Sequence, residues 1–169
     1  EKFNIKNHPS VEAQVAAISD DIAYNSHDLG DGLRASFFTL NDIKTLPIVG
    51  EAYEIVEKKY KLANYKIKCH EILRYFLNKL VNELIFESSR RLHFFKNKKI
   101  DDIQNHKCSI VSFNDKIKSE IEIVSKYLFK NMYRNKHVIL ERKRCSKIIR
   151  DLFNHYLKNP NLLPYEWQE

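Results

Sequence analysis

Cysteine, glycine and proline are scarce in this chain of 169 residues, which holds three cysteines, three glycines and four prolines. So few glycines and prolines leave few turn-forming positions, which favours long helices over a sheet of many short strands. Cys69, Cys108 and Cys145 show neither a CxxC spacing nor histidines at zinc-ligand distances, so neither a disulfide framework nor a zinc site is predicted. They are expected to be thiols in a reducing cytoplasm. No apolar run reaches about 18 residues, so no membrane-spanning segment is expected.

Apolar residues recur at helical spacing along most of the chain, which predicts an all-α fold with one buried core. The segment 108–113 alternates as a short strand would, and an extended linker is the open alternative. The predicted helices span Val11–Leu29, Ile48–Tyr60, Asn64–Phe94, a stretch from the N-cap Asn114 to Arg134, and Val138–Leu157. The residues expected to face inward include Val15, Ile22, Leu29, Ile72, Phe76, Leu77, Leu80, Val81, Leu84, Ile85, Ile148, Ile149, Leu152, Phe153 and Tyr156.

An acidic island interrupts a chain of net charge +7. No Lys or Arg occurs between Lys6 and Arg34, and the 27 intervening residues hold five acids. Within this island, Ser10 is expected to start a helix and Gly30 with Gly32 to end it. The five acids are Glu12, Asp20, Asp21, Asp28 and Asp31.

Asp20, Tyr24 and Asp28 are spaced i, i+4 and i+8, which places them on one side of this helix, opposite its apolar stripe. That side otherwise carries small residues, among them Ala16 and Ala17. Two interpretations stay open. The side is a solvated acidic face, or Asp20 binds a hard divalent cation and the residues below it contact a polar ligand.

Four ordered segments carry a family resemblance. SDDIAYNSHDLGDGLR, LVNELIFESSRRL, FKNMYRNKHV and KIIRDLFNHYLKNPNLLPYEW are similar to successive later segments of HD-domain deoxynucleoside triphosphate triphosphohydrolases of the bacterial dGTPase-like branch. The resemblance covers nearly the whole chain. It implies an all-α helical bundle of the HD-domain type.

The resemblance also implies residue roles. Asp20 matches the final Asp of the family's H…HD…D metal set, Tyr24 matches the tyrosine that packs against the sugar, and Asp28 matches the acid that holds the 3′-hydroxyl. Arg134 lies in a basic segment similar to one near the substrate or effector region, where Asn135 departs from the family's usual histidine.

His27 and Asp28 form an HD dipeptide that invites a different interpretation. In the family pattern the metal-binding HD lies upstream of the DDIAY segment, whereas this dipeptide lies downstream of it. His27 is therefore expected to be a histidine near a helix C-terminus, where positive charge is favourable, rather than a metal ligand.

The first His and the HD pair of the family are absent from the chain, so the other ligands of a divalent metal such as Mg²⁺ or Mn²⁺ are expected to lie outside it. Residues 1–34 are expected to form the last segment of the metal and substrate site, and residues 35–169 the helical remainder of the same domain. The chain is expected to be truncated at both ends and inactive alone. The resemblance implies that the intact protein hydrolyses a deoxynucleoside triphosphate (dNTP) similar to dGTP, and that the products are a deoxynucleoside and inorganic triphosphate. It is expected to be a homo-oligomer, with a nucleotide or single-stranded DNA as effector.

Two alternatives to an active hydrolase stay open. The segment Lys126–Arg150 is the most basic part of the chain, and aromatic residues interleave with its basic residues: Tyr127, Phe129 and Tyr133 with Lys130, Arg134 and Lys136. This is typical of a helical nucleic-acid-binding module, although aromatics at helical spacing are more often core. A catalytically dead relative is the other alternative. In addition, Lys66, Lys68, Arg74 and Lys79 are expected to form a solvated face, with phosphate contact as the second interpretation.

Overall fold

The computed structural model describes residues 8–96 and 99–168, and its helices divide between two units. No strand occurs among these described residues, so the prediction of an all-α fold is confirmed. The first unit ends at Leu128 and the second begins at Phe129. Each unit is described by itself.

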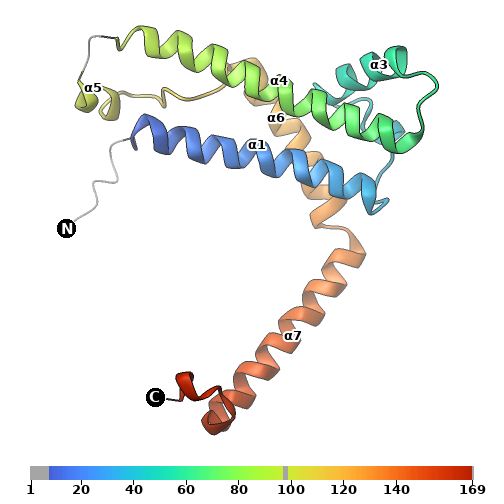
Figure 1. The fold of residues 1–169 in the computed structure, drawn as a ribbon, viewed down its shortest axis with the longest axis vertical. Helices are drawn as coiled ribbons and strands as arrows, with labels where there is room; N and C mark the ends of the chain where they lie inside the picture. Colours follow the sequence, from blue (N-terminus) through green and yellow to red (C-terminus); the bar gives the residue numbers. More distant parts are fainter. Residues whose placement is uncertain (1–7, 97–98, 169) are drawn as a thin grey trace. The chain divides into compact units, whose positions relative to one another are not determined.

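The first unit is built on two long helices that lie side by side, α1 (Val11–Arg34) and α4 (Tyr65–His93) (Figure 1). Helix α3 (Val49–Lys59) packs on α4, and α6 (Asp115–Leu128) packs on α1. Two short helices, α2 (Leu40–Ile43) and α5 (Ile100–Gln104), lie in the connections between them. The fully buried residues include Leu29 on α1, Phe76 on α4 and Val124 on α6, so one apolar core joins these elements.

Asparagine and serine side chains start the long helices. Ser10 Oγ accepts a hydrogen bond from the Ala13 amide at 3.3 Å, and Asn64 Oδ1 accepts one from the Ile67 amide at 2.9 Å. Asn114 Oδ1 does the same for Ile117 at 2.9 Å, as its predicted N-cap role requires. Each side chain satisfies an amide that the first helical turn leaves without an intrahelical acceptor.

Helix α1 does not end at Gly30 and Gly32, so the predicted end at Leu29 is wrong. The helix continues to Arg34, and both glycines are buried inside it. A Cβ on Gly32 would overlap the Phe38 ring, and one on Gly30 would lie 3.0 Å from Leu73 Cδ1. The glycines therefore allow close packing against α1 rather than a turn, and this packing outweighs their low helix propensity.

The segment 108–113 is not a strand; it is an irregular connection with bends that runs between α1 and α4 (Figure 1), with Ile110, Val111 and Phe113 buried. Three side chains of the two helices form hydrogen bonds with the backbone of this segment, and a fourth, Glu87, holds one of them in place. We call these four residues the polar clamp: Gln14, Glu87, Ser88 and Arg91. Three of the four are buried polar residues in an otherwise apolar interior.

Gln14 supplies the α1 side of the polar clamp. Its Oε1 accepts hydrogen bonds from the Ile110 amide at 3.0 Å, the Val111 amide at 3.1 Å and the Ser109 hydroxyl at 2.6 Å. Its Nε2 donates to the Pro9 carbonyl at 2.9 Å. One side chain thus satisfies two buried backbone amides that have no strand partner to bond.

The α4 side of the polar clamp is charged. Arg91 donates to Glu87 at 2.8 Å, to the Ser109 carbonyl at 2.9 Å and to the Phe113 carbonyl at 3.4 Å. Arg90 donates two further bonds to Glu87, and Ser88 Oγ accepts from the Ser112 amide at 3.3 Å. The guanidinium groups of Arg90 and Arg91 hold the pKa of Glu87 at about 2, well below its ordinary value of 4.5.

Several residues expected in the core are exposed. Val15, Leu77, Val81 and Ile85 lie on outer sides of α1 and α4, because the buried stripe of α4 is narrow and consists of Ile72, Phe76, Leu80 and Leu84. The apolar residues of α4 therefore occupy a wider part of the helix surface than its packed neighbours cover.

The second unit begins with a π-helical turn, Phe129–Tyr133, followed by α7 (Lys136–Lys158) and the 3-10 turns Pro160–Leu162 and Tyr165–Trp167. The predicted helix from Asn114 thus changes its hydrogen-bond pattern after Leu128. No side chain of the described residues 129–168 is buried, so the inward placement predicted for α7 is wrong. The misplaced residues are Ile148, Ile149, Leu152 and Phe153, which are exposed, and Tyr156, which is half-buried.

Replacing Gln14 tests the α1 side of the polar clamp. Gln14→Leu leaves the Ile110 and Val111 amides buried without an acceptor, so the free energy of unfolding should fall by about 2–4 kcal/mol. Urea unfolding followed by circular dichroism measures this change. Gln104→Leu is the matched control, because no hydrogen bond of its side chain occurs among the described residues, and it should change stability by less than about 0.5 kcal/mol. Equal effects of the two substitutions would contradict the role of Gln14.

The low pKa of Glu87 predicts a pH-dependent stability. A carboxyl group whose pKa is depressed in the folded state stabilises the fold above its unfolded pKa and loses that contribution as the pH falls. Glu87→Gln should therefore cost about 2 kcal/mol at neutral pH, and the deficit should shrink between pH 4.5 and about 2. Glu122→Gln, which removes an exposed ion pair with Lys126, is the control and should leave the stability nearly unchanged at every pH. If the loss of stability in Glu87→Gln does not depend on pH, the charge of Glu87 is not its cause.

Candidate functional site

The candidate site lies on the side of α1 that faces away from the core. Ile22, Leu29 and Leu33 are buried on the inner side. On the outer side Asp20 is exposed, Tyr24 is 60% exposed and Asp28 is half-buried. Because α1 is continuous, the three residues follow one another at single-turn intervals over about 12 Å of helix.

Small residues extend this outer side toward the start of α1. Ala13, Ala16 and Ala17 are exposed, and together with Asp20, Tyr24 and Asp28 they form what we call the α1 face. Short side chains leave the space in front of Asp20 open to a ligand or another polypeptide segment. Within the described part of the chain, no Lys, Arg or His nitrogen forms an ion pair with Asp20 or Asp21. The acidic island therefore keeps negative charge at the middle of α1.

Asp20 is one oxygen ligand and not a complete metal site. Nowhere in residues 8–96 and 99–168 do three His, Cys, Asp or Glu side chains gather closely enough to hold a metal ion. The donor chemistry of an exposed carboxylate suits a hard divalent cation, but one carboxylate alone does not hold it in a fixed geometry. His27 is exposed on α1, about two turns before the helix ends at Arg34, and belongs to no such group among the described residues.

Arg134 lies in the second unit and directly follows the π-helical turn. Its guanidinium carbon is 5.1 Å from the centroid of the Phe129 ring, and the Phe129 and Tyr133 rings stack at 6.3 Å. Asn135 caps α7 by accepting a hydrogen bond from the His137 amide at 3.0 Å. The asparagine that departs from the family pattern thus has a structural role of its own at the helix start.

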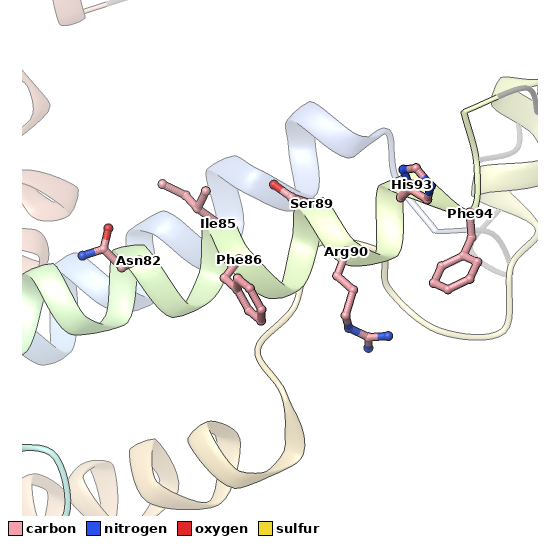
Figure 2. A pocket seen from close by; sticks show the side chains of 7 residues that line it. All are labelled: Asn82, Ile85, Phe86, Ser89, Arg90, His93 and Phe94. Atoms are coloured by element: carbon pink, nitrogen blue, oxygen red, sulfur yellow. The ribbon is translucent and has the colours of Figure 1, made fainter.

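A surface hollow of about 620 Å³ lies on the outer side of α4. It shares no residue with the α1 face. Figure 2 shows that the side chains around it, among them Ile85, Phe86 and Phe94, all come from α4 and its end. Phe86 is 69% exposed there. A surface formed along one helix has no opposing wall, so we do not assign it a ligand.

The sequence analysis missed the residues of the polar clamp that hold the two long helices to the segment 108–113. Arg91 lies in the last turn of α4, where a cation is favourable without any tertiary partner, so its position in the sequence does not indicate the contacts that it makes. Gln14 gave a signal that could have been used: it falls between the apolar positions Val11 and Ile18, near the core side of α1, where a polar residue needs a buried partner.

No helix among the described residues combines the length and hydrophobicity that crossing a membrane requires.

Comparison with known proteins identifies relatives over nearly the whole chain. Residues 111–169 match the phosphohydrolase-associated domain. A deoxyguanosinetriphosphate triphosphohydrolase-like protein of Roseobacter denitrificans is 37% identical over 160 residues, which is 95% of this chain and 41% of that protein. Proteins of the same description from Brucella suis and from Jannaschia sp. are each 36% identical, over 98% and 99% of this chain.

The resemblance predicted from the four segments is therefore confirmed. The chain spans about two fifths of the length of these curated relatives, with 41% of the first two and 42% of the third covered.

Proposed function

From the relationship to deoxyguanosinetriphosphate triphosphohydrolase-like proteins, we propose that this chain is part of an enzyme that hydrolyses deoxynucleoside triphosphates. The products are a deoxynucleoside and inorganic triphosphate. The observation that supports this most is the α1 face, on which a carboxylate, a tyrosine and a second carboxylate follow at one-turn intervals with small residues beside them. Such a face offers a metal ligand, a flat ring and a hydroxyl acceptor to one extended substrate.

Asp20 is the proposed metal ligand. Its carboxylate is exposed and suits Mg²⁺ or Mn²⁺, and it would need further ligands from outside this chain. The bound metal would supply electrophilic polarisation of the phosphate and a more acidic water. The contribution of this chain is to hold the Asp20 carboxylate on a helix whose position the packed core of the first unit fixes.

Tyr24 and Asp28 are the proposed sugar contacts. The Tyr24 ring, one turn from Asp20, presents a large exposed surface on which a deoxyribose can pack. The Asp28 carboxylate, a further turn along, can accept a hydrogen bond from the 3′-hydroxyl. The order Asp20, Tyr24, Asp28 along α1 would match the order phosphate, sugar, 3′-hydroxyl in the substrate.

Arg134 is the proposed phosphate contact. It is exposed, and a guanidinium beside an aromatic ring keeps N–H donors available to a phosphate group.

Residues 1–34 and 35–169 would then be two portions of one catalytic domain of a longer protein, and the chain alone would be inactive. The reason is the incomplete ligand set around Asp20 in the described residues. We further propose a homo-oligomer, with a nucleotide or single-stranded DNA as effector.

Triphosphate release tests the hydrolase proposal. The intact protein that contains this chain should release inorganic triphosphate from at least one dNTP with Mn²⁺ or Mg²⁺, as followed by ³¹P NMR. Asp20→Ala should lower the rate by about 100-fold or more, because it removes a metal ligand. Asp21→Ala is the matched control: it removes the neighbouring exposed carboxylate and should keep activity within about threefold. The absence of release with every dNTP, also with a second nucleotide or single-stranded DNA present, would contradict the proposal.

The second unit favours a second candidate function, binding of single-stranded nucleic acid. Residues 129–169 hold nine Lys and Arg against four Asp and Glu, and Phe129 is 53% exposed beside Arg134 rather than buried in a core. Exposed aromatic rings beside cations can stack on bases while the cations pair with phosphates.

Anisotropy of a labelled oligonucleotide tests this second function without a metal. Affinity should fall steeply between about 50 and 200 mM salt, and Phe129→Ala should weaken binding by about 1–3 kcal/mol through loss of base stacking. Phe86→Ala, which removes a more exposed ring from α4, is the control and should leave affinity unchanged. If Phe129→Ala and Phe86→Ala bind the oligonucleotide equally well, Phe129 does not stack on bases and the nucleic-acid-binding function is contradicted.

A further inference from the structure

A groove on the first unit lies between the end of α3 and the middle of α4, and none of its lining residues belongs to α1. Its volume is about 260 Å³. This is below the volume of about 300–1,000 Å³ typical of sites for drug-sized ligands, so the groove suits a smaller molecule. We call it the α3–α4 groove.

The charge of this groove is unbalanced. Lys59, Arg74 and Lys79 line it, whereas Glu71 is the one carboxylate in its lining. Arg74 pairs with Glu71 at 2.6 Å, and Lys79 pairs with Glu83 at 3.3 Å. Lys59 forms no ion pair with an Asp or Glu of the described residues, and it interacts with Glu71 only over a longer distance, where its charge helps to lower the pKa of that carboxyl.

The ion pair between Arg74 and Glu71 orients the guanidinium without using all of its donors. One nitrogen, Nη2, bonds Glu71, while the guanidinium has five N–H groups in a planar fork. The hydrogen bond from Arg74 also lowers the pKa of Glu71, which keeps that carboxylate charged and the pair intact. The remaining N–H groups are available to a second acceptor, and phosphate oxygens match the geometry of the fork.

The surroundings of the two cations are partly apolar and aromatic. The Lys59 ammonium is 5.3 Å from the centroid of the Tyr60 ring, and Ile55 with the buried Val56 lines the same groove. Both cations are themselves exposed, so water and salt screen their attraction to a bound anion, and the apolar wall excludes water from one side only. Lys59 and Arg74 also come from different helices, so one anion between them would be held from two sides.

From this arrangement we propose that the α3–α4 groove binds a small phosphate-bearing anion between Lys59 and Arg74. The proposed hydrolase site on α1 shares no residue with this groove. Binding here requires neither the metal nor catalytic activity.

Titration with inorganic phosphate and with pyrophosphate tests the proposal on the purified protein, in EDTA and at low ionic strength. Calorimetry or amide chemical shifts should show saturable binding with a Kd below about 1 mM for pyrophosphate, with the largest shifts at residues of the α3–α4 groove. The double variant Lys59→Gln/Arg74→Gln should weaken this binding by about fivefold or more, because it removes both charged contacts.

The matched control is Lys116→Gln/Lys126→Gln, which changes the net charge equally on exposed positions of α6 in the same unit. It should leave the Kd within about twofold, since no groove contact is lost. The single variant Lys59→Gln breaks no ion pair and supplies the test if the double variant is unstable. Equal weakening by the groove and control variants, or no saturable binding of either anion, would overturn the proposal. Neither result would bear on triphosphate release, because the titration contains no metal and measures no hydrolysis.

Discussion

The first unit depends on a buried backbone that has no regular partner. Between α5 and α6 the chain passes through the interior as an irregular segment, and without side-chain partners its buried amides would lack acceptors. Gln14 on α1 and Ser88 with Arg91 on α4 provide the hydrogen bonds that a neighbouring strand would otherwise provide. Because an unsatisfied buried amide costs about 1–3 kcal/mol, these side chains fix the position of both long helices against the same segment. The face that carries Asp20, Tyr24 and Asp28 is the outer side of one of these two helices.

The parts of the fold that follow from local rules were predictable. Asn64 and Asn114 are N-caps, and the 3/4 repeat of Ile72, Phe76 and Leu80 gives the buried stripe of α4. The placement of Asp20, Tyr24 and Asp28 on one side of α1 needed only the helical period and a continuous helix. Their proposed roles came from the family resemblance rather than from periodicity.

The other parts depend on contacts that are distant in the sequence. Gly30 and Gly32 predict a helix end, and only the position of Leu73 and Phe38 shows why they lie inside a helix. The segment 108–113 alternates as a strand does, yet its hydrogen-bond partners are side chains about 20 and 95 residues away. Helix α7 has a clear apolar stripe, but none of its side chains is buried among the described residues. An apolar period predicts which side of a helix needs a partner, and it does not identify that partner.

Amide hydrogen exchange measured by NMR tests most directly whether side chains of α1 and α4 hold the segment 108–113. The amides of Ile110, Val111 and Ser112 should exchange as slowly as core amides such as those of Ile22 and Phe76, because opening them requires α1 and α4 to separate. Exchange of these three amides at the rate of exposed connections such as residues 105–107 would show that the segment is not held. The two long helices would then need another explanation for their packing.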